Sequence, residues 1–480
     1  MAGPARSSRL SRRSALRLGL GATLGAMTLP LLAACQPAAP SPTAAPAKPG
    51  KPTAAAPAAS PSASPVASPA AAQAAPAGRP SLPNLSGASL TVLQWASFVP
   101  DSDPFFRKQI EDDFMKNTGA NVTIEFVNAD DLQPKVNAAV QSGSGPDIIQ
   151  FQYNWQHLYR DSIVDVTDVA EEVKKNTGDF WPQIEAACKV GGKYLAVPHD
   201  LVPTVVHWRK SWFKEAGADR FPATYADYHA LGKKLKADGH PFGQALSHAF
   251  GDPPTWCYPL LWAYGGRELD EQGKVAINSP ETIAAVTEMK NAWKDAYDET
   301  GFGWDGGANN RAFLAETISA TLNGASIWWV ARKDQKPFLD DIGLDFLPAG
   351  PKGQTSFTVN NNYAIMKYSK NVDAARAFIR WSMSDPVWMP WFELSGSYYD
   401  GVGPKQDDNP IWQKFPPVTQ VFKGMGKITR WPGWPGPWDE KAGLAQSKYI
   451  IVDMFTKAAQ GDTPEAAVAW AENELRQVYT

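Results

Sequence analysis

The sequence predicts an α/β protein in which helices cover both faces of a parallel sheet. Residues 90–95, 122–127 and 147–151 are short β-prone runs, and two stretches of helical periodicity separate them. Strand, helix, strand, helix, strand at these lengths is typical of a parallel sheet. Past residue 190 the pattern restarts, and residues 86–480 are long enough for two domains.

Local signals place the individual elements. The first helix carries Phe106, Ile110 and Phe114 on one face, and Gly119 marks its end. Later helices are expected after the capping residues Thr224, Ser279 and Thr463, with one more over residues 372–383. Further strands are expected at residues 193–198, 205–208, 320–322 and 363–366.

The first 35 residues predict an export signal, with five arginines, no acidic residue and a Gly/Ala/Leu run. Arg12-Arg13 resembles a twin-arginine signal, but Ala15 replaces the usual phenylalanine, so the Tat and Sec routes both stay open. Leu32-Ala33-Ala34-Cys35 is similar to a bacterial lipobox, in which Cys35 takes the lipid. An ordinary signal peptide with a chance cysteine is the alternative.

Residues 36–85 are almost entirely Ala, Pro and Ser, with no aromatic and no acidic residue. Such a segment cannot bury a core, so we expect a disordered tether that holds the body off a membrane. Together with the lipobox it predicts a protein anchored on the outer face of the cytoplasmic membrane, at the cell surface or in a periplasm.

Charge and cysteine content exclude several functions. Without the five signal arginines, 41 of the 46 basic residues remain against 49 acidic ones, a net charge of about −8. This argues against nucleic acid or an anionic membrane as the partner. Cys188 and Cys257 lack metal-ligand spacing, so they either pair or remain as core thiols. We expect neither cofactor nor metal, and no catalytic motif is apparent.

Ligands of parallel sheets gather beyond the carboxyl ends of the strands. Two groups of residues follow such ends in the predicted sheet, and we expect them to bind ligand: Trp95 with Ser97, and Tyr153 with Asn154 and Trp155.

Several short motifs occur in an order that resembles a known family. They are Gly145-Pro146-Asp147-Ile148-Ile149, Gly192–Pro198, Trp208–Gly217, Ala312–Gly324 and Leu347-Pro348-Ala349-Gly350-Pro351. The chain resembles the bacterial extracellular solute-binding proteins of sugar ABC importers, to which maltose-binding proteins belong. The resemblance implies a two-lobed periplasmic-binding-protein fold, with a hinge of crossing strands and an interlobe ligand cleft. The crossings would be 197–203 and 357–362, lobe 1 about 88–198 and 355–385, and lobe 2 about 199–350 and 386–480.

The resemblance also implies further ligand-binding residues. A sugar offers apolar CH faces for aromatic rings and hydroxyls for polar groups. The aromatic candidates are Trp256, Tyr258, Trp262, Trp328, Trp329, Trp434 and Trp438. The polar candidates are Asp200, Asn360 and Asn361 on the crossings, for which a hinge salt bridge and ordinary turn use are the competing interpretations.

The resulting hypothesis is a lipid-anchored, monomeric receptor that captures a sugar by lobe closure and presents it to an ABC permease, without catalysis. The alternatives are a surface-tethered carbohydrate-active hydrolase, which needs a carboxylate pair, and a binding protein of the same fold for a cation such as a polyamine, which needs several cleft carboxylates.

Overall fold

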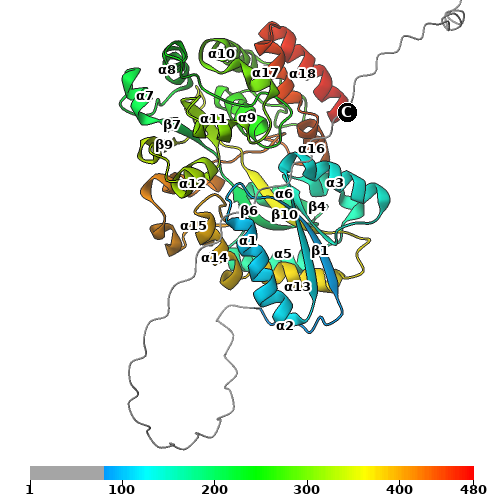
Figure 1. Ribbon diagram of the computed structural model, residues 1–480. Helices are drawn as coiled ribbons and strands as arrows, with labels where there is room; N and C mark the ends of the chain where they lie inside the picture. The colour runs from blue at the N-terminus through cyan, green and yellow to red at the C-terminus, as the bar shows by residue number, and fades with distance from the viewer. Residues whose placement is uncertain (1–79) are drawn as a thin grey trace, which may run out of the picture. The chain divides into compact units, whose positions relative to one another are not determined.

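The computed structural model describes residues 80–480, which form two lobes, each built around its own sheet (Figure 1). The predicted export signal, Cys35 and the tether up to residue 79 lie outside the described residues. The first lobe holds a five-stranded sheet in the order β2 (Asn121–Val127), β1 (Ser89–Trp95), β3 (Ile148–Gln152), β10 (Val359–Ile365) and β6 (Val197–Val202).

Strands β1, β2 and β3 are parallel, as predicted, while β10 runs antiparallel to both β3 and β6. Every residue of β3, β6 and β10 is buried, as expected of a sheet covered on both faces. The covering elements of this lobe are α1 (Ser102–Gln109), a π-helical turn η1 (Ile110–Met115), α2 (Lys116–Thr118), α3 (Ala129–Ser142), α4 (Trp155–Leu158), η2 (Arg160–Ser162), α5 (Thr167–Thr177), α6 (Pro182–Cys188), the hairpin β4 (Lys189–Val190) and β5 (Lys193–Tyr194), α13 (Val372–Ser382) and α14 (Asp385–Ser395).

The second lobe surrounds an antiparallel sheet in the order β8 (Ala320–Asn323), β7 (Val205–Arg209) and β9 (Ile342–Asp345). Its helices α8 (Tyr225–Ala237), α10 (Pro280–Ala296), α17 (Ile450–Ala459) and α18 (Pro464–Tyr479) gather at the end of the body that faces away from β1 and α13 (Figure 1). The other elements of this lobe are α7 (Lys210–Glu215), α9 (Asp252–Tyr264), η3 (Glu299–Gly303), α11 (Ala308–Leu314), α12 (Ser326–Lys333), η4 (Leu339–Asp341) and α16 (Glu440–Ser447). The segment before α16 contacts both lobes, since α15 (Pro404–Asp407) packs against α5 and η6 (Pro417–Phe422) against β9; η5 (Pro410–Lys414) and η7 (Met425–Lys427) belong to the same segment.

The lobes are joined at strands β6 and β10, which pair with each other; β6 is the edge strand of the larger sheet, and β10 is its neighbour. The chain leaves the first lobe through β6 and enters the second through β7, and it returns through β10. A third segment joins them, because Asp400 exchanges two backbone hydrogen bonds with Leu201 of β6, at 2.7 and 3.0 Å. The hinge therefore contains three chain segments side by side.

The helix caps follow the sequence prediction. The side chains of Thr224, Ser279 and Thr463 each accept a hydrogen bond from the backbone N–H three residues later.

The Gly145-Pro146-Asp147 motif has a structural role at the start of β3. The Asp147 carboxylate accepts hydrogen bonds from the Thr91 backbone at 2.8 Å and from its hydroxyl at 2.9 Å, which fastens the start of β3 to β1.

Two expected strand boundaries are wrong. The run at 193–198 is divided, since β5 ends at Tyr194 and β6 begins at Val197 and continues to Val202. Pro198 is tolerated because β6 is an edge strand. The run at 363–366 is only the end of β10, which begins at Val359. Three consecutive asparagines, which have low β-propensity, hide that beginning, and the register shifts between Asn361 and Asn362.

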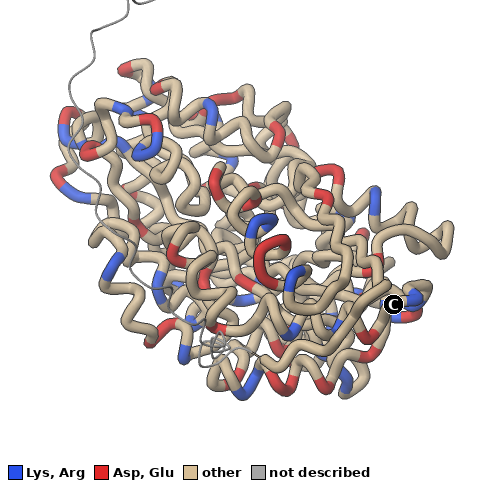
Figure 2. The backbone as a smooth tube through the Cα atoms, turned by 60° about the horizontal axis from the view of Figure 1, so that its bottom comes forward, with Lys and Arg blue, Asp and Glu red and all other residues tan. Residues whose placement is uncertain are grey.

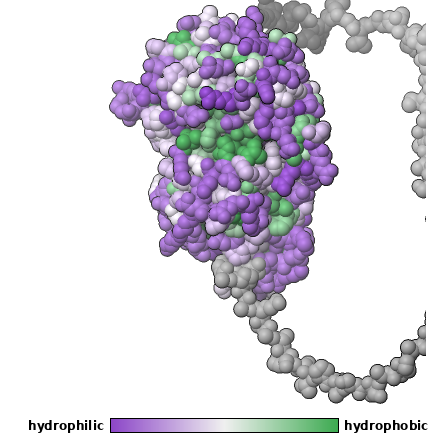
Figure 3. All heavy atoms as spheres, turned by 90° about the vertical axis from the view of Figure 1, so that its left-hand side faces the viewer, coloured by the Kyte–Doolittle hydropathy of each residue, from purple (hydrophilic) through white to green (hydrophobic). Residues whose placement is uncertain are grey.

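The surface is mostly hydrophilic, with an apolar area in the middle of one face (Figure 3). Leu82 and Leu85 pack against the core, so ordered packing begins a few residues before residue 86.

Cys188 and Cys257 are both buried and unpaired. Of the two interpretations that the sequence left open, a disulfide or two core thiols, the structure therefore has the core thiols.

Candidate functional site

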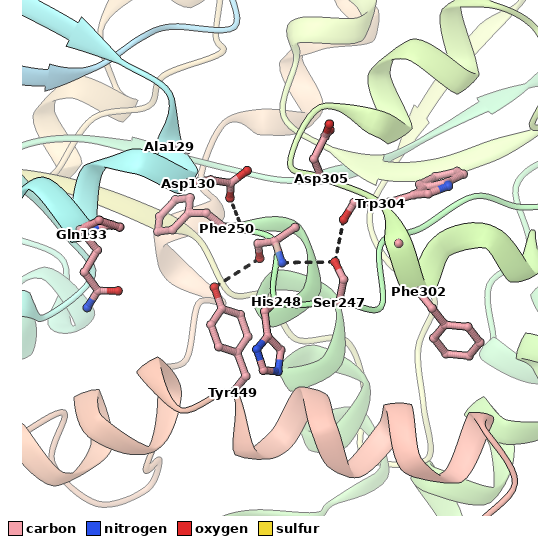
Figure 4. A pocket seen from close by; sticks show the side chains of 13 residues that line it. Ala129, Asp130, Gln133, Ser247, His248, Phe250, Phe302, Trp304, Asp305 and Tyr449 are labelled. Atoms are coloured by element: carbon pink, nitrogen blue, oxygen red, sulfur yellow. Dashed lines mark hydrogen bonds between the residues drawn. The ribbon is translucent and has the colours of Figure 1, made fainter. Parts of the chain in front are cut away.

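Three adjoining cavities lie between the lobes, with volumes of about 470, 30 and 20 Å³. Phe250 lines all three, and Figure 4 shows the largest of them. Residues of α3 in the first lobe line one side of the largest cavity, and residues 247–250 and 302–305 of the second lobe line the other. Together the three cavities mark the interlobe cleft.

Phe250 of the second lobe projects among three aromatic rings of the first lobe. Its ring centroid lies 6.1 Å from Trp95, 5.4 Å from Tyr153 and 6.2 Å from Trp155. Its backbone N–H donates to Asp130 Oδ1 at 2.8 Å, a contact visible in Figure 4. This aromatic cluster gives the cleft flat apolar surfaces of the kind that stack on ligands.

The sheet positions the three first-lobe rings. Trp95 is the last residue of β1, and Tyr153 and Trp155 follow the end of β3, so all three lie at the carboxyl edge as predicted. Tyr153 adopts a left-handed backbone conformation with φ 52°. The amides of Asn360 and Asn362 hold it there by donating to its carbonyl oxygen at 2.8 and 3.0 Å.

Two polar atoms of these rings are buried without a partner among residues 80–480. They are the indole Nε1 of Trp95 and the phenol oxygen of Tyr153. Trp95 lines the cavity of 30 Å³ and Tyr153 the cavity of 20 Å³. Buried polar groups normally have partners, so each of these two atoms lacks a hydrogen bond that a bound molecule could supply.

The cleft also contains carboxylates that the sequence analysis did not select. Asp252 begins α9, and its buried Oδ2 has no partner within the described part of the chain. Burial, with the nearby carboxylates of Asp130 and Asp305, raises the pKa of Asp252 well above its usual range. The Asp305 carboxylate, unlike that of Asp252, has a partner, because Arg311 donates to both of its oxygens at 2.8 Å.

Two of the predicted polar residues on the crossing strands, Asp200 and Asn361, bind each other. Asp200 accepts from His199 Nδ1 at 2.6 Å and from Asn361 Nδ2 at 2.7 Å, and all three residues are buried. Burial raises the pKa of Asp200, and the bond to His199 opposes that shift. The Asn360 amide instead donates to the Tyr153 carbonyl, and neither asparagine lies in a turn.

The second-lobe aromatic segment of α9 packs inside its own lobe. Trp256 contacts Trp293 and Tyr297, with centroids 6.1 and 5.4 Å away. Tyr258 donates its hydroxyl to Glu268 at 3.2 Å, and Trp262 lies 6.0 Å from Phe357. None of the three predicted rings lines any of the three cavities that the described residues form.

Trp328 and Trp329 on α12 lie outside the lining of these cavities as well. Their rings meet edge to face at 4.9 Å, and the Arg332 guanidinium lies over both. The indole N–H of Trp329 donates to the Gly396 carbonyl at 2.6 Å. Ser97, the other residue predicted near Trp95, donates its backbone N–H to the Asp103 carboxylate at 3.0 Å.

The tryptophan-rich loop at 430–440 divides its rings between two environments. Trp438 is buried 6.4 Å from Tyr153 and 5.9 Å from Phe357, directly behind the cleft. Trp434 is half-buried beneath the Arg430 guanidinium, 4.0 Å from its ring centroid. Asn154 connects this loop to the first lobe, since its side-chain amide donates to the Trp438 carbonyl at 3.1 Å.

Of the fifteen predicted ligand-binding residues, the cavity lining therefore includes Trp95, Tyr153 and Trp155. It also includes residues that sequence reasoning missed, namely Asp130, His248, Phe250, Asp252, Trp304, Tyr398 and Tyr449. One signal was available for two of them: Gly251, with φ 85°, separates Phe250 from Asp252 immediately before the predicted aromatic segment. A turn of this kind brings the backbone close to a site.

Residues 80–480 contain no group of three or more His, Cys, Asp or Glu side chains placed to hold a metal ion. In the same part of the chain, no helix has both the length and the apolar character needed to span a membrane.

Comparison with curated proteins finds distant relatives. A protein of Deinococcus radiodurans, described as a probable ABC transporter-binding protein, is 25% identical over 268 residues, which is 50% of this chain and 58% of the relative. The diacetylchitobiose binding protein DasA of Streptomyces coelicolor is 24% identical over 323 residues, which is 62% of this chain and 70% of that protein. The chain thus matches less than two thirds of the first of these relatives.

The fold itself has close counterparts among solved structures. The maltose-bound MalE3 protein of T. maritima superposes with a TM-score of 0.70 at 20% identity, over 82% of this chain and 100% of that one. This similarity establishes the two-lobed fold. The sequence pattern of the bacterial extracellular solute-binding proteins matches residues 99–387, more than half of the sequence. The chain therefore belongs to the family of bacterial extracellular solute-binding proteins.

Proposed function

We propose that the protein is the substrate-binding component of an ABC importer, which captures a sugar in the interlobe cleft and delivers it to a membrane permease. The observation that carries this proposal is the cluster of Trp95, Tyr153 and Trp155 of the first lobe around Phe250 of the second. Aromatic rings suit the apolar faces of a sugar, and the unpartnered Trp95 Nε1 and Tyr153 hydroxyl suit its oxygens. Relatives that bind diacetylchitobiose and maltose support the same ligand class.

Capture would depend on lobe closure. A ligand that touches both lobes stabilises the closed state over the open one, and only this difference drives the change. The Lys333–Asp101 ion pair at 2.7 Å connects α12 of the second lobe to the start of α1 in the first, and the Phe250–Asp130 bond connects the same two lobes. Both are direct contacts between the lobes that do not involve a ligand.

In this proposal Cys35 carries the lipid and residues 36–79 span the distance to the body, which works as a monomer and does not transform its ligand. Replacing Cys35 by Ser should release the protein from the membrane fraction. Continued membrane retention of that variant would exclude lipidation as the anchor.

Sugar binding is tested by titrating the purified full chain with mono- and oligosaccharides while following tryptophan fluorescence. Trp155→Ala should weaken binding by about 1–3 kcal/mol, because the ring both stacks and excludes water. Trp434→Ala is the matched control, since that ring lies outside the cavity lining. Equal affinity in the Trp155→Ala variant and the wild type would remove this ring from the site.

A further inference from the structure

The lining of the cleft has a charge pattern that a neutral sugar does not require. Among the described residues that line the three cavities are three carboxylates, Asp130, Asp252 and Asp305, and no lysine or arginine. Elsewhere basic and acidic residues are interspersed along the backbone (Figure 2), whereas this lining contains acidic residues and neither lysine nor arginine.

The three carboxylates are not equally compensated. Asp305 is bound through both oxygens by Arg311, and Asp130 accepts the Phe250 N–H. Of these three carboxylates, only that of Asp252 has a buried oxygen for which the described residues supply no hydrogen-bond partner. Its position in the first turn of α9 favours a negative charge, but burial of an unpaired carboxylate is unfavourable unless a cation or a hydrogen-bond donor approaches it.

The surroundings of Asp252 suit a small cation. It shares the cavity of about 30 Å³ with Trp95, Phe98 and Tyr398, and a space of this size holds one group as large as a water molecule. Aromatic rings attract ammonium groups through their π-faces, most strongly where water is excluded. The outer cavity, which shares Ala129 and Phe250 with the inner one, has about 470 Å³ for the rest of a ligand.

We propose that the captured sugar carries a protonated amino group, which lies against the Asp252 carboxylate and the aromatic rings around it. This inference rests on the proposed function. The hydroxylated part of the ligand occupies the outer cavity between α3 and residues 302–305. The raised pKa of Asp252 fits this arrangement, because an adjacent ammonium group supplies the positive charge that the apo site lacks.

The test compares matched ligands by isothermal titration calorimetry on the full chain purified in detergent. Each amino sugar is paired with its hydroxyl counterpart: glucosamine with glucose, galactosamine with galactose, and chitobiose with cellobiose. Diacetylchitobiose, whose nitrogen atoms are acetylated and uncharged, tests whether the charge is needed. Spermidine, an amine without a sugar, tests whether the sugar is needed. At about pH 6.5 the sugar amines are largely protonated.

We expect at least one amino sugar to bind about tenfold or more tightly than its hydroxyl counterpart, and Asp252→Asn to abolish that preference. Asp131→Asn removes the same charge from the exposed side of α3, outside the cavity lining, and should keep it. The wild-type comparison is decisive even if Asp252→Asn fails to fold.

The inference is overturned if every neutral sugar binds at least as tightly as its amino counterpart, or if the preference persists in a folded Asp252→Asn variant. Either result leaves sugar capture intact. Binding of spermidine with no sugar bound overturns both the inference and the proposed function.

Discussion

Asn361 on β10 donates its side-chain amide to the Asp200 carboxylate on β6 across 2.7 Å, inside the hinge. The other oxygen of the same carboxylate accepts from His199 at 2.6 Å. One buried carboxylate therefore connects the two strands through which the chain passes between the lobes. Its partners are protein groups, so its contribution is to the stability of the hinge.

Asp200→Ala should lower the free energy of unfolding by about 3 kcal/mol, because it leaves the buried His199 ring and the Asn361 amide without their acceptor. Urea unfolding followed by fluorescence measures this change. Asp238→Ala, an exposed position at the end of α8, should stay within about 0.5 kcal/mol of the wild type. A loss confined to ligand affinity, with unchanged stability, would instead place Asp200 in the ligand site.

Tyr153→Phe should separate binding from stability. The Tyr153 hydroxyl is buried without a partner in the described residues, so its removal should leave the free energy of unfolding unchanged or raise it by about 1 kcal/mol. Sugar affinity should fall by about 0.5–1.5 kcal/mol through one lost hydrogen bond.

Tyr363→Phe is the matched control for that experiment, because the Tyr363 hydroxyl donates to Gln94 at 2.6 Å within the first lobe. It should lose stability and retain affinity. The reverse outcome for the two variants would contradict the assignment of Tyr153 to the cleft.

Glu268 should make stability depend on pH. Burial raises its pKa from 4.5 to about 7, although the Gly433 N–H and the Tyr258 hydroxyl donate to it. As pH rises from about 4.5 to 7 the unfolded chain loses this proton first, so the folded state loses stability on the order of 3 kcal/mol. The contribution is fully present below pH 4.5 and lost above pH 7.

Glu268→Gln should remove this pH-dependent loss. Compared with the wild type at the same pH, the variant should therefore be more stable at pH 8 than it is at pH 5. Urea unfolding of both proteins at the two pH values gives the difference directly. A parallel pH dependence in the two proteins would show that Glu268 does not titrate in this range.

The tryptophans of the 430–440 loop should differ in their effect on stability. Trp438→Ala should cost about 3–5 kcal/mol, because it opens a cavity beside Tyr153 and Phe357. Trp434→Ala removes only a half-buried ring that contacts Arg430, and should cost about 1 kcal/mol. Thermal unfolding ranks the two variants, and equal losses would contradict their different burial.

Short-range signals account for what the sequence could predict. Thr224, Ser279 and Thr463 cap helices because the partner of each is three residues away, and Trp95, Tyr153 and Trp155 reach the cleft because strand ends locate them. Periodicity could not orient the rings of α9, since nearly every residue of that helix is buried and no face is distinct. For Phe250 the neighbouring Gly251 was the one local signal, and the aromatic contacts of its ring could not be predicted, because they are made with the opposite lobe.

The hinge has a consequence for how the molecule moves. The described chain starts on the first lobe, where Leu85 donates its backbone N–H to Thr118, and it ends on the second lobe in α18, which packs against α10 and α17. The two termini of the body therefore belong to opposite halves of the molecule. The proposed tether at the amino end would hold only the first of these halves, so the proposed closure would move the other, and a donor–acceptor dye pair at residues 80 and 480 should report that closure as a change in energy transfer.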